Sequence, residues 1–160
     1  MSLLSLDDPW AAYAGTIVQI VRPSEGDFVT VRGAAPGSPP GQIGRWPWPS
    51  QEPVCILTAW DPGGERPGVE VNRHRGAVLE SALRRRASRV LHAVGVDPSS
   101  RHREEGVATL GLSVDDAVAL GVQYRQEAIF VWTPQAWSIV SCRDDRRVDF
   151  SWSVVVLRPM

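Results

Sequence analysis

Polar side chains gather where an apolar run of the sequence ends and the next helix is expected to begin. Thr58, Trp60 and Asp61 close the run, and Asn72 and Arg75 lie near the start of the predicted helix. Residues three apart share a helical face, so Asn72 and Arg75 point the same way. A guanidinium binds a phosphate or a carboxylate through two hydrogen bonds, assisted by N–H groups at a helix start. These five residues therefore predict a pocket for a small polar or anionic ligand, such as a nucleotide or another metabolite.

A purely structural interpretation of the same residues stays open. Asp61 and Asn72 are also typical turn and helix-cap residues. Arg75 would then pair with a structural acid.

Two acids and an amide could complete the pocket. Glu104 and Glu105 begin a predicted strand, and Gln126 precedes another. Successive strand side chains point to opposite faces, so at most one of the two carboxylates enters the pocket. There it would bind Arg75 or act as a general base, which requires burial to raise its pKa towards neutrality. The alternatives are a solvated acidic turn or a structural Glu–Arg pair.

The histidines show no metal-binding pattern. His74, His92 and His102 are never four residues apart, and no cysteine is near any of them in the sequence. We therefore predict no metal and no cofactor, and expect surface or hydrogen-bonded histidines. His74 is the one placed to join the pocket, because it is adjacent to Arg75.

Composition excludes several reaction classes. All 17 basic residues are arginine, and a chain without lysine cannot form a lysine Schiff base, attach pyridoxal phosphate or use a P-loop lysine. The sequence also lacks GxSxG and CxxC motifs. It names no catalytic residue, and an enzymatic role would depend on Glu104 or Glu105.

Basic and aromatic residues raise the question of nucleic-acid binding. Arg84–Arg86 and Arg89 lie on the predicted helix, and Trp46 and Trp48 lie in a proline-rich segment. The net charge is −1, however, and successive helical residues point about 100° apart, so the arginines form no stripe. Nucleic acid is not favoured. The two tryptophans either cover the sheet as a lid or plug, or bind a protein partner together with a sheet edge. That protein-interaction module is the alternative function.

The apolar pattern predicts a single α+β domain over residues 1–160, with a mostly antiparallel or mixed sheet of about six strands and two helices packed on it. Residues 33–53, rich in Pro, Gly and Trp, are expected to be a loop within the domain. A turn is predicted at 61–64. The predicted strands are 16–21, 28–31, 54–60, 107–112, 128–133 and 137–142, with a last one at 150–157, and the predicted helices are 71–94 and 113–124.

The chain is expected to be cytoplasmic and bacterial. Asp7 and Asp8 lie where a secretory signal is basic and apolar, and no run approaches the roughly 20 apolar residues of a membrane span. Cys55 and Cys142 lie in apolar runs, which predicts buried free thiols, with a disulfide or reactive pair as the alternative. The lack of lysine beside abundant Ala, Val, Gly and Arg is typical of a GC-rich bacterial genome.

Five short motifs, taken in order, resemble the bacterial domain-of-unknown-function family 3293. The resemblance spans about residues 57–131, near half of the chain. That family usually has Asn where this chain has Asp61, so a carboxylate replaces an amide donor. The resemblance implies candidate positions and no particular activity. The motifs are LTAWDP at 57–62, Asn72 with Arg75, EEG at 104–106, AVALG at 117–121 and QEAI at 126–129.

Overall fold

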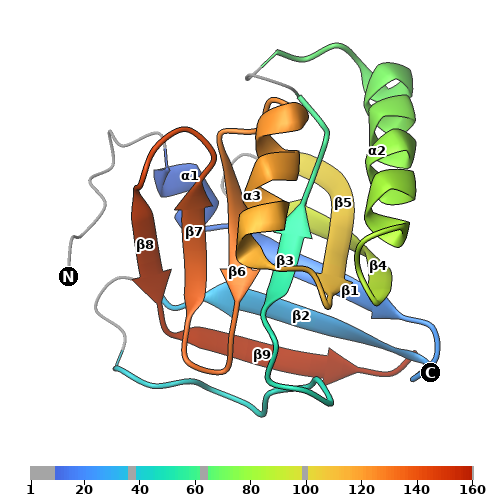
Figure 1. The fold of residues 1–160 in the computed structure, drawn as a ribbon. Coiled ribbons are helices and arrows are strands. Elements are labelled where there is room, and N and C mark those ends of the chain that lie inside the picture. Colours follow the sequence, from blue (N-terminus) through green and yellow to red (C-terminus); the bar gives the residue numbers. More distant parts are fainter. Residues whose placement is uncertain (1–9, 36–38, 62–64, 99–100, 160) are drawn as a thin grey trace.

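The structure, a computed structural model, describes residues 10–35, 39–61, 65–98 and 101–159. The N-terminal stretch, residues 36–38 of the proline-rich loop and residues 62–64 of the predicted turn lie outside that range. Nine strands and three helices are formed by the described residues (Figure 1). In chain order they are α1 (Ala11–Ala14), β1 (Ile17–Arg22), β2 (Asp27–Gly33), β3 (Val54–Leu57), α2 (Val69–Arg84), β4 (Arg89–Val96), β5 (Arg103–Leu110), α3 (Val114–Gln123), β6 (Ala128–Trp132), β7 (Trp137–Ser141), β8 (Arg147–Phe150) and β9 (Trp152–Leu157).

The nine strands form one antiparallel sheet that curls into a nearly closed barrel. The strand order is β8-β7-β6-β3-β5-β4-β1-β2-β9, and every pair of neighbouring strands is antiparallel. The curl brings distant parts of this order together. A Cβ placed on Gly33 at the end of β2 would lie 3.0 Å from the Trp137 ring of β7, so a glycine here favours the close approach of these strands. Figure 1 shows β2 and β9 crossing behind the lower ends of β6 and β7.

The predicted fold class, about six strands with two packed helices, is wrong. The predicted helix 71–94 ends at Arg84, and the residues after it form β4, a full strand between β1 and β5. Apolar residues at three- and four-residue spacing suggested one long helix, but Leu91 and Ala93 also alternate with their neighbours and face the barrel interior. Residues 147–150, of which only the last lay in a predicted strand, form another strand, β8. The result is a mostly β protein with only three helices in its described part.

Strand alternation divides the apolar side chains between two cores. The barrel interior is filled by one set of alternate residues, which includes Val18, Ile56 and Trp132. The opposite set, with Cys55 and Leu57 among it, packs under α2 and α3. Both helices therefore lie on the outer face of the sheet, α2 against β4 and β5 and α3 against β3 and β6. The two cysteines are buried free thiols, as predicted, and burial raises the pKa of Cys55 to about 12 and that of Cys142 to about 11.

The start of α3 follows from its sequence. The Ser113 side chain accepts a hydrogen bond from the Asp116 N–H at 3.1 Å and so caps the helix, which was predicted over residues 113–124. The buried face of the helix includes Ala117 and Leu120. At Gly121, a Cβ would lie 2.5 Å from the Cys142 sulfur, so the glycine lets α3 press against the end of β7. Among the described residues, no helix is long and apolar enough to cross a membrane.

The segment from Trp46 to Pro49 closes one end of the barrel. Trp48 is buried, and the Trp46 ring packs edge-on against Trp132 with ring centroids 5.0 Å apart. Arg22 holds the segment in place, because its guanidinium donates to the Pro47 carbonyl oxygen and lies over the Trp48 ring at 5.3 Å. Asp27 neutralises that arginine through two hydrogen bonds of 2.8 and 2.7 Å. Trp48 thus belongs to the core, and the half-buried Trp46 packs against it.

Candidate functional site

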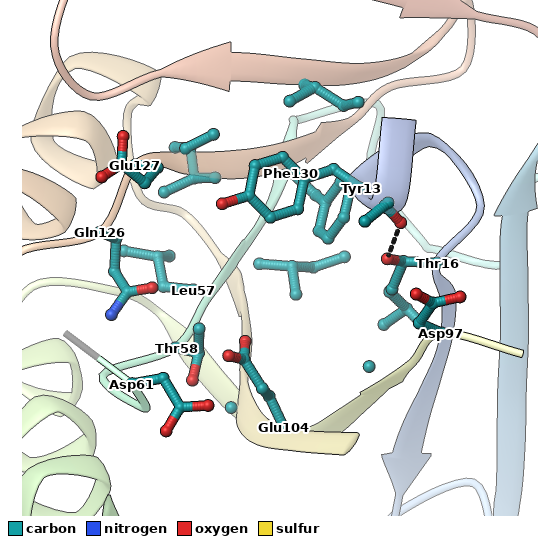
Figure 2. A pocket seen from close by; sticks show the side chains of 18 of the residues that line it. Tyr13, Thr16, Leu57, Thr58, Asp61, Asp97, Glu104, Gln126, Glu127 and Phe130 are labelled. Carbon is teal, nitrogen blue, oxygen red and sulfur yellow. Dashed lines mark hydrogen bonds between the residues drawn. The ribbon is translucent and has the colours of Figure 1, made fainter. Parts of the chain in front are cut away.

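A cavity of about 250 Å³ opens at the other end of β1, in the mouth of the barrel. The short helix α1 covers it on one side through Ala12 and Tyr13 (Figure 2). Its inner wall is apolar, with Val18, Ile56 and Phe130 among its residues. Polar side chains surround the outer part. Mouths of β-barrels are common ligand sites, because the interior row of side chains ends there and leaves space.

The polar lining is the continuation of the barrel's interior rows. Interior positions recur every second residue, so Ile56 on β3 is followed by Thr58. Ala108 on β5 is preceded at the same spacing by Gly106 and then Glu104. The sequence thus switches from apolar to polar residues along each interior row as the strand leaves the core. This switch turns the end of the barrel into a polar cavity.

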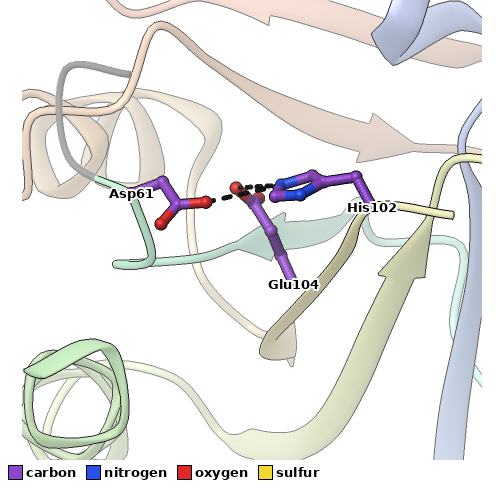
Figure 3. Close-up of side chains that lie close together, drawn as sticks. All are labelled: Asp61, His102 and Glu104. Atoms are coloured by element: carbon purple, nitrogen blue, oxygen red, sulfur yellow. Dashed lines mark hydrogen bonds and ion pairs between the residues drawn. The ribbon is translucent and has the colours of Figure 1, made fainter. Parts of the chain in front are cut away.

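Three of these polar residues form a compact cluster (Figure 3). The Nε2 atom of His102 lies 3.2 Å from Oε1 of Glu104 and 3.4 Å from Oδ2 of Asp61. One donor or acceptor atom from each of the three residues lies within 4.8 Å of the other two. All three side chains are half-buried, with Asp61 the least exposed at 13%. The cluster brings two carboxylates together around a single imidazole.

The electrostatics of the cavity are acidic on the inside. Burial raises the pKa of Glu104, the nearby Asp61 carboxylate adds to this, and the His102 contact opposes it. Burial also raises the pKa of Tyr13, and the Glu127 and Glu104 carboxylates raise it further. A phenol and a carboxyl group whose charged forms are both disfavoured therefore face the same space. The cavity suits a ligand that supplies positive charge or hydrogen-bond donors.

The backbone after β3 is held by two side chains of α2, Asn72 and Arg75. The Asp61 N–H donates to Oδ1 of Asn72, and the Asn72 amide donates to Oδ1 of Asp61, at 3.0 and 2.9 Å. Arg75 donates to the carbonyl oxygens of Ala59 and Tyr124, both at 3.0 Å. Because Asn72 occupies Oδ1, the other carboxylate oxygen of Asp61 is directed towards His102. The backbone of Asp61 is left-handed (φ 48°), a conformation that Asp and Asn adopt more easily than most residues.

Gln126 and Thr58 complete this support. The Gln126 amide donates to the Trp60 carbonyl oxygen at 3.0 Å. The Thr58 hydroxyl donates to the Glu105 carbonyl oxygen at 2.9 Å and accepts from the Trp60 N–H at 3.0 Å. At Gly106, a Cβ would lie 2.4 Å from the Leu57 carbonyl oxygen, so only glycine allows β5 to approach β3 here. The short motifs of the sequence therefore fix the segment that carries Asp61.

The structure separates the residues predicted for one pocket into two groups. Lining the cavity are Thr58, Asp61, Glu104 and Gln126. The other four, Trp60, Asn72, Arg75 and Glu105, do not line it. Asn72 is buried inside α2, and the Arg75 guanidinium donates to two backbone carbonyls, so both residues have structural contacts, but Asn72 is not the helix cap and Arg75 does not pair with the expected acid. The two adjacent glutamates do point to opposite sides, as strand geometry required.

A smaller cavity of about 170 Å³ lies on the opposite side of the same strands. Glu105 and Trp60 line it, together with His92 of β4 and residues of α2. Trp60 packs across the helix at Gly76, where a Cβ would lie 3.6 Å from the indole nitrogen. Glu105 and His92 are therefore matched with Glu104 and His102 in residue type but face a different space.

Sequence reasoning missed several lining residues. Tyr13 reaches the cavity from α1, a helix of four residues too short to predict from a pattern. His102 was expected to be a surface or hydrogen-bonded histidine, and sequence spacing cannot reveal a partner as distant as Asp61. Asp97 and Phe130 also line the cavity. A signal was available for Glu104, since interior parity counted back from Ala108 points it inward.

Fold and site together define a class: a small antiparallel β-barrel, covered on one side by two helices, with an acidic cavity at one mouth. Residues 57–129 match the family described as Protein of unknown function (DUF3293), which confirms the resemblance predicted from the sequence. No curated protein and no solved structure matched the chain. The matched part contains Asp61, His102, Glu104 and Gln126, but not Tyr13.

Proposed function

We propose that the cavity at the barrel mouth binds a small polar ligand that carries a hydrogen-bond donor or positive charge and an apolar portion. This proposal rests on one observation: the carboxylates of Asp61 and Glu104 both lie at the polar end of a cavity whose inner wall is apolar. Donor groups of the ligand would face the carboxylates. Its apolar part would lie against Phe130 and the interior wall.

Size and charge narrow the ligand class. A volume of about 250 Å³ lies below the range of about 300–1,000 Å³ typical of drug-sized ligands. The fit is therefore better for an amine, amino acid or sugar than for a nucleotide. The arginines that line the cavity, Arg66 and Arg125, are exposed at its edge. An anionic ligand has less support, because Arg75, its expected partner, donates to backbone carbonyls.

The alternative function, a protein-interaction module, has no comparable support. It needs Trp46 and Trp48 to be available to a partner, whereas Trp48 is buried and Trp46 packs on the barrel core. We therefore develop the ligand-binding proposal alone.

A thermal-shift screen of the full chain tests the proposal. Amines, amino acids, sugars and carboxylates would be screened in buffer containing EDTA, so that metal ions do not contribute. A ligand at about 100 times its Kd adds about 2.7 kcal/mol of stability, which raises Tm by about 5–10 °C at this chain length.

Three variants locate the binding. Glu104→Gln removes a cavity carboxylate, and Ala128→Leu fills part of the cavity without touching the charged cluster. Glu105→Gln is the matched control, one residue away on the opposite side of the sheet. The proposal requires a shift in the wild type and in Glu105→Gln that is lost or much reduced in the other two. Equal shifts in all four proteins, or no saturable binding by any compound, would overturn it.

A further inference from the structure

We propose that Asp61, His102 and Glu104 form a binding site for a divalent transition-metal ion at the polar end of the cavity. This inference rests on the proposed function in one respect, since the ion would share the cavity with the ligand. It goes further by naming an occupant for the charged cluster. It also assigns His102 a role that its spacing from the other histidines did not predict.

The donor set suits a first-row transition metal. One imidazole nitrogen and two carboxylate oxygens are the hard and borderline ligands that Zn²⁺, Mn²⁺ and Co²⁺ accept. Ca²⁺ and Mg²⁺ prefer oxygen ligands alone, which makes the histidine the discriminating residue. Two ionised carboxylates carry a combined charge that a divalent ion would neutralise.

The distances fit such an ion. Ligand atoms about 2.0–2.2 Å from a tetrahedrally coordinated metal lie about 3.3–3.6 Å from one another. The two distances from His102 Nε2 are 3.4 Å to Asp61 and 3.2 Å to Glu104. The spacing of the carboxylate oxygens, within 4.8 Å, needs at most a small rotamer adjustment. Nε2 faces both carboxylates, whereas its single N–H can be aligned with only one of them.

The supporting structure favours a fixed site. Asn72 holds one oxygen of Asp61 and leaves the other directed at the cluster. Glu104 and His102 lie two residues apart at the start of β5 and thus on the same side of the sheet. Three protein ligands leave at least one coordination position for water or a ligand, which is the usual composition of zinc sites that handle a substrate. In this position, a ligand oxygen or nitrogen within the cavity would complete the coordination.

Metal binding can be measured with the ions alone. Protein freed of metal would be titrated with Zn²⁺, Mn²⁺ and Co²⁺ by calorimetry, and the Co²⁺ complex also by visible absorption, which reports coordination geometry. We expect one ion per chain and the intense absorption of a four- or five-coordinate Co²⁺ centre. The two buried thiols, Cys55 and Cys142, would show a sulfur charge-transfer band if they were the ligands instead.

Three conservative variants and one control decide the assignment. Asp61→Asn, His102→Asn and Glu104→Gln should each weaken binding about tenfold or more, since loss of even an outer-shell partner commonly costs about 10–100-fold. Asp61→Asn tests the site with little risk to folding, because an amide keeps both the left-handed backbone and a carbonyl oxygen for Asn72. The control is the double variant Glu105→Gln with His92→Asn, which removes the same residue types from the second cavity.

The outcomes separate this inference from the proposed function. No saturable binding of any of the three ions, or binding that the control loses and the ligand variants keep, would overturn the metal site. Loss in His102→Asn alone would also overturn it, because the proposed site has three ligands. The organic screen in EDTA is independent, so organic binding without metal binding would refute the ion and leave the cavity proposal standing. Metal binding without binding of any organic compound would refute the cavity proposal and leave the metal site standing.

Discussion

Two clusters of charged side chains lie at opposite ends of β1, and they differ in how completely their charges are matched. At one end, Arg22 and Asp27 form a buried pair with two short hydrogen bonds and cancelling charges. At the other end, Asp61 and Glu104 share the single imidazole of His102. A matched pair is complete in itself and serves the fold. An excess of one sign in a cavity needs a further group, which is why we assign binding to the second cluster.

Removing Arg22 should produce the largest effect. Arg22→Leu would leave Asp27 buried without a counter-charge and release the Pro47 carbonyl, and breaking such a pair typically costs about 3–5 kcal/mol. Urea denaturation at neutral pH measures this loss. Arg84→Gln is the control, because its pair with Glu80 is exposed and worth only about 0.3–0.5 kcal/mol. Similar losses in the two variants would contradict the structural role of the buried pair.

Replacing Arg75 should cost less stability than replacing Arg22, and it should lower metal affinity less than replacing His102 does, because Arg75 only supports the segment that carries Asp61. Arg75→Ala would remove charged hydrogen bonds from the Ala59 and Tyr124 carbonyls, which we expect to destabilise the fold by about 2 kcal/mol. Denaturation and metal titration of the same variant, well below its Tm, check both statements. A loss of metal affinity in folded Arg75→Ala as large as that in His102→Asn would contradict this supporting role.

Glu104→Gln should change stability in the opposite direction. Burial raises the pKa of Glu104, so its charged form costs stability at neutral pH, and a neutral amide should gain about 0.5–1 kcal/mol without metal. Binding residues commonly show such a trade-off between stability and function. Glu105→Gln should stay within about 0.5 kcal/mol of the wild type. A clear destabilisation by Glu104→Gln would make this acid structural, like Asp27.

The smallest expected effect on stability concerns Glu25, which lies beside Arg22 and pairs with Arg89. The hydrogen bond from Arg89 lowers the pKa of Glu25 below its ordinary value of 4.5. A lowered folded-state pKa stabilises the protein above the ordinary value, and that contribution disappears as the pH falls through the lowered pKa. Unfolding free energies measured between pH 6 and pH 3 should therefore fall slightly less steeply in Glu25→Gln than in the wild type. A steeper fall in the variant would reverse the assigned sign.

Local rules predicted some parts of the molecule well. The apolar runs closely predicted β1, β2, β6 and β7, and the predicted second helix begins at Ser113, the N-cap of α3. Strand alternation predicted that Glu104 and Glu105 face different sides. These features depend on residues a few positions apart, for which backbone geometry alone restricts the choices.

Residues 87–96 show where local rules fail. Val90, Leu91 and Val94 fit both a helical stripe and a strand, and the sequence offers no proline or glycine between Arg84 and Leu91 to decide. Pairing with β1 and β5 on both sides selects the strand. Because β4 was not predicted, the barrel was not predicted either. β4 connects the β1–β2 hairpin to the rest of the sheet.

By itself, the sequence determined which residue types are present for chemistry, where several strands and a helix begin, and the match of residues 57–129 to a family of unknown function. It also determined that the polar motifs near 58–61 and 104–106 follow or precede apolar strands. Only the tertiary structure decided which of those side chains meet. The tertiary fold brings His102 close to both Asp61 and Glu104. It also ties Asn72 and Arg75 to the segment after β3 and buries Trp48. The physical reason is that barrel closure depends on many weak contacts between residues far apart in the chain, and no local pattern encodes them.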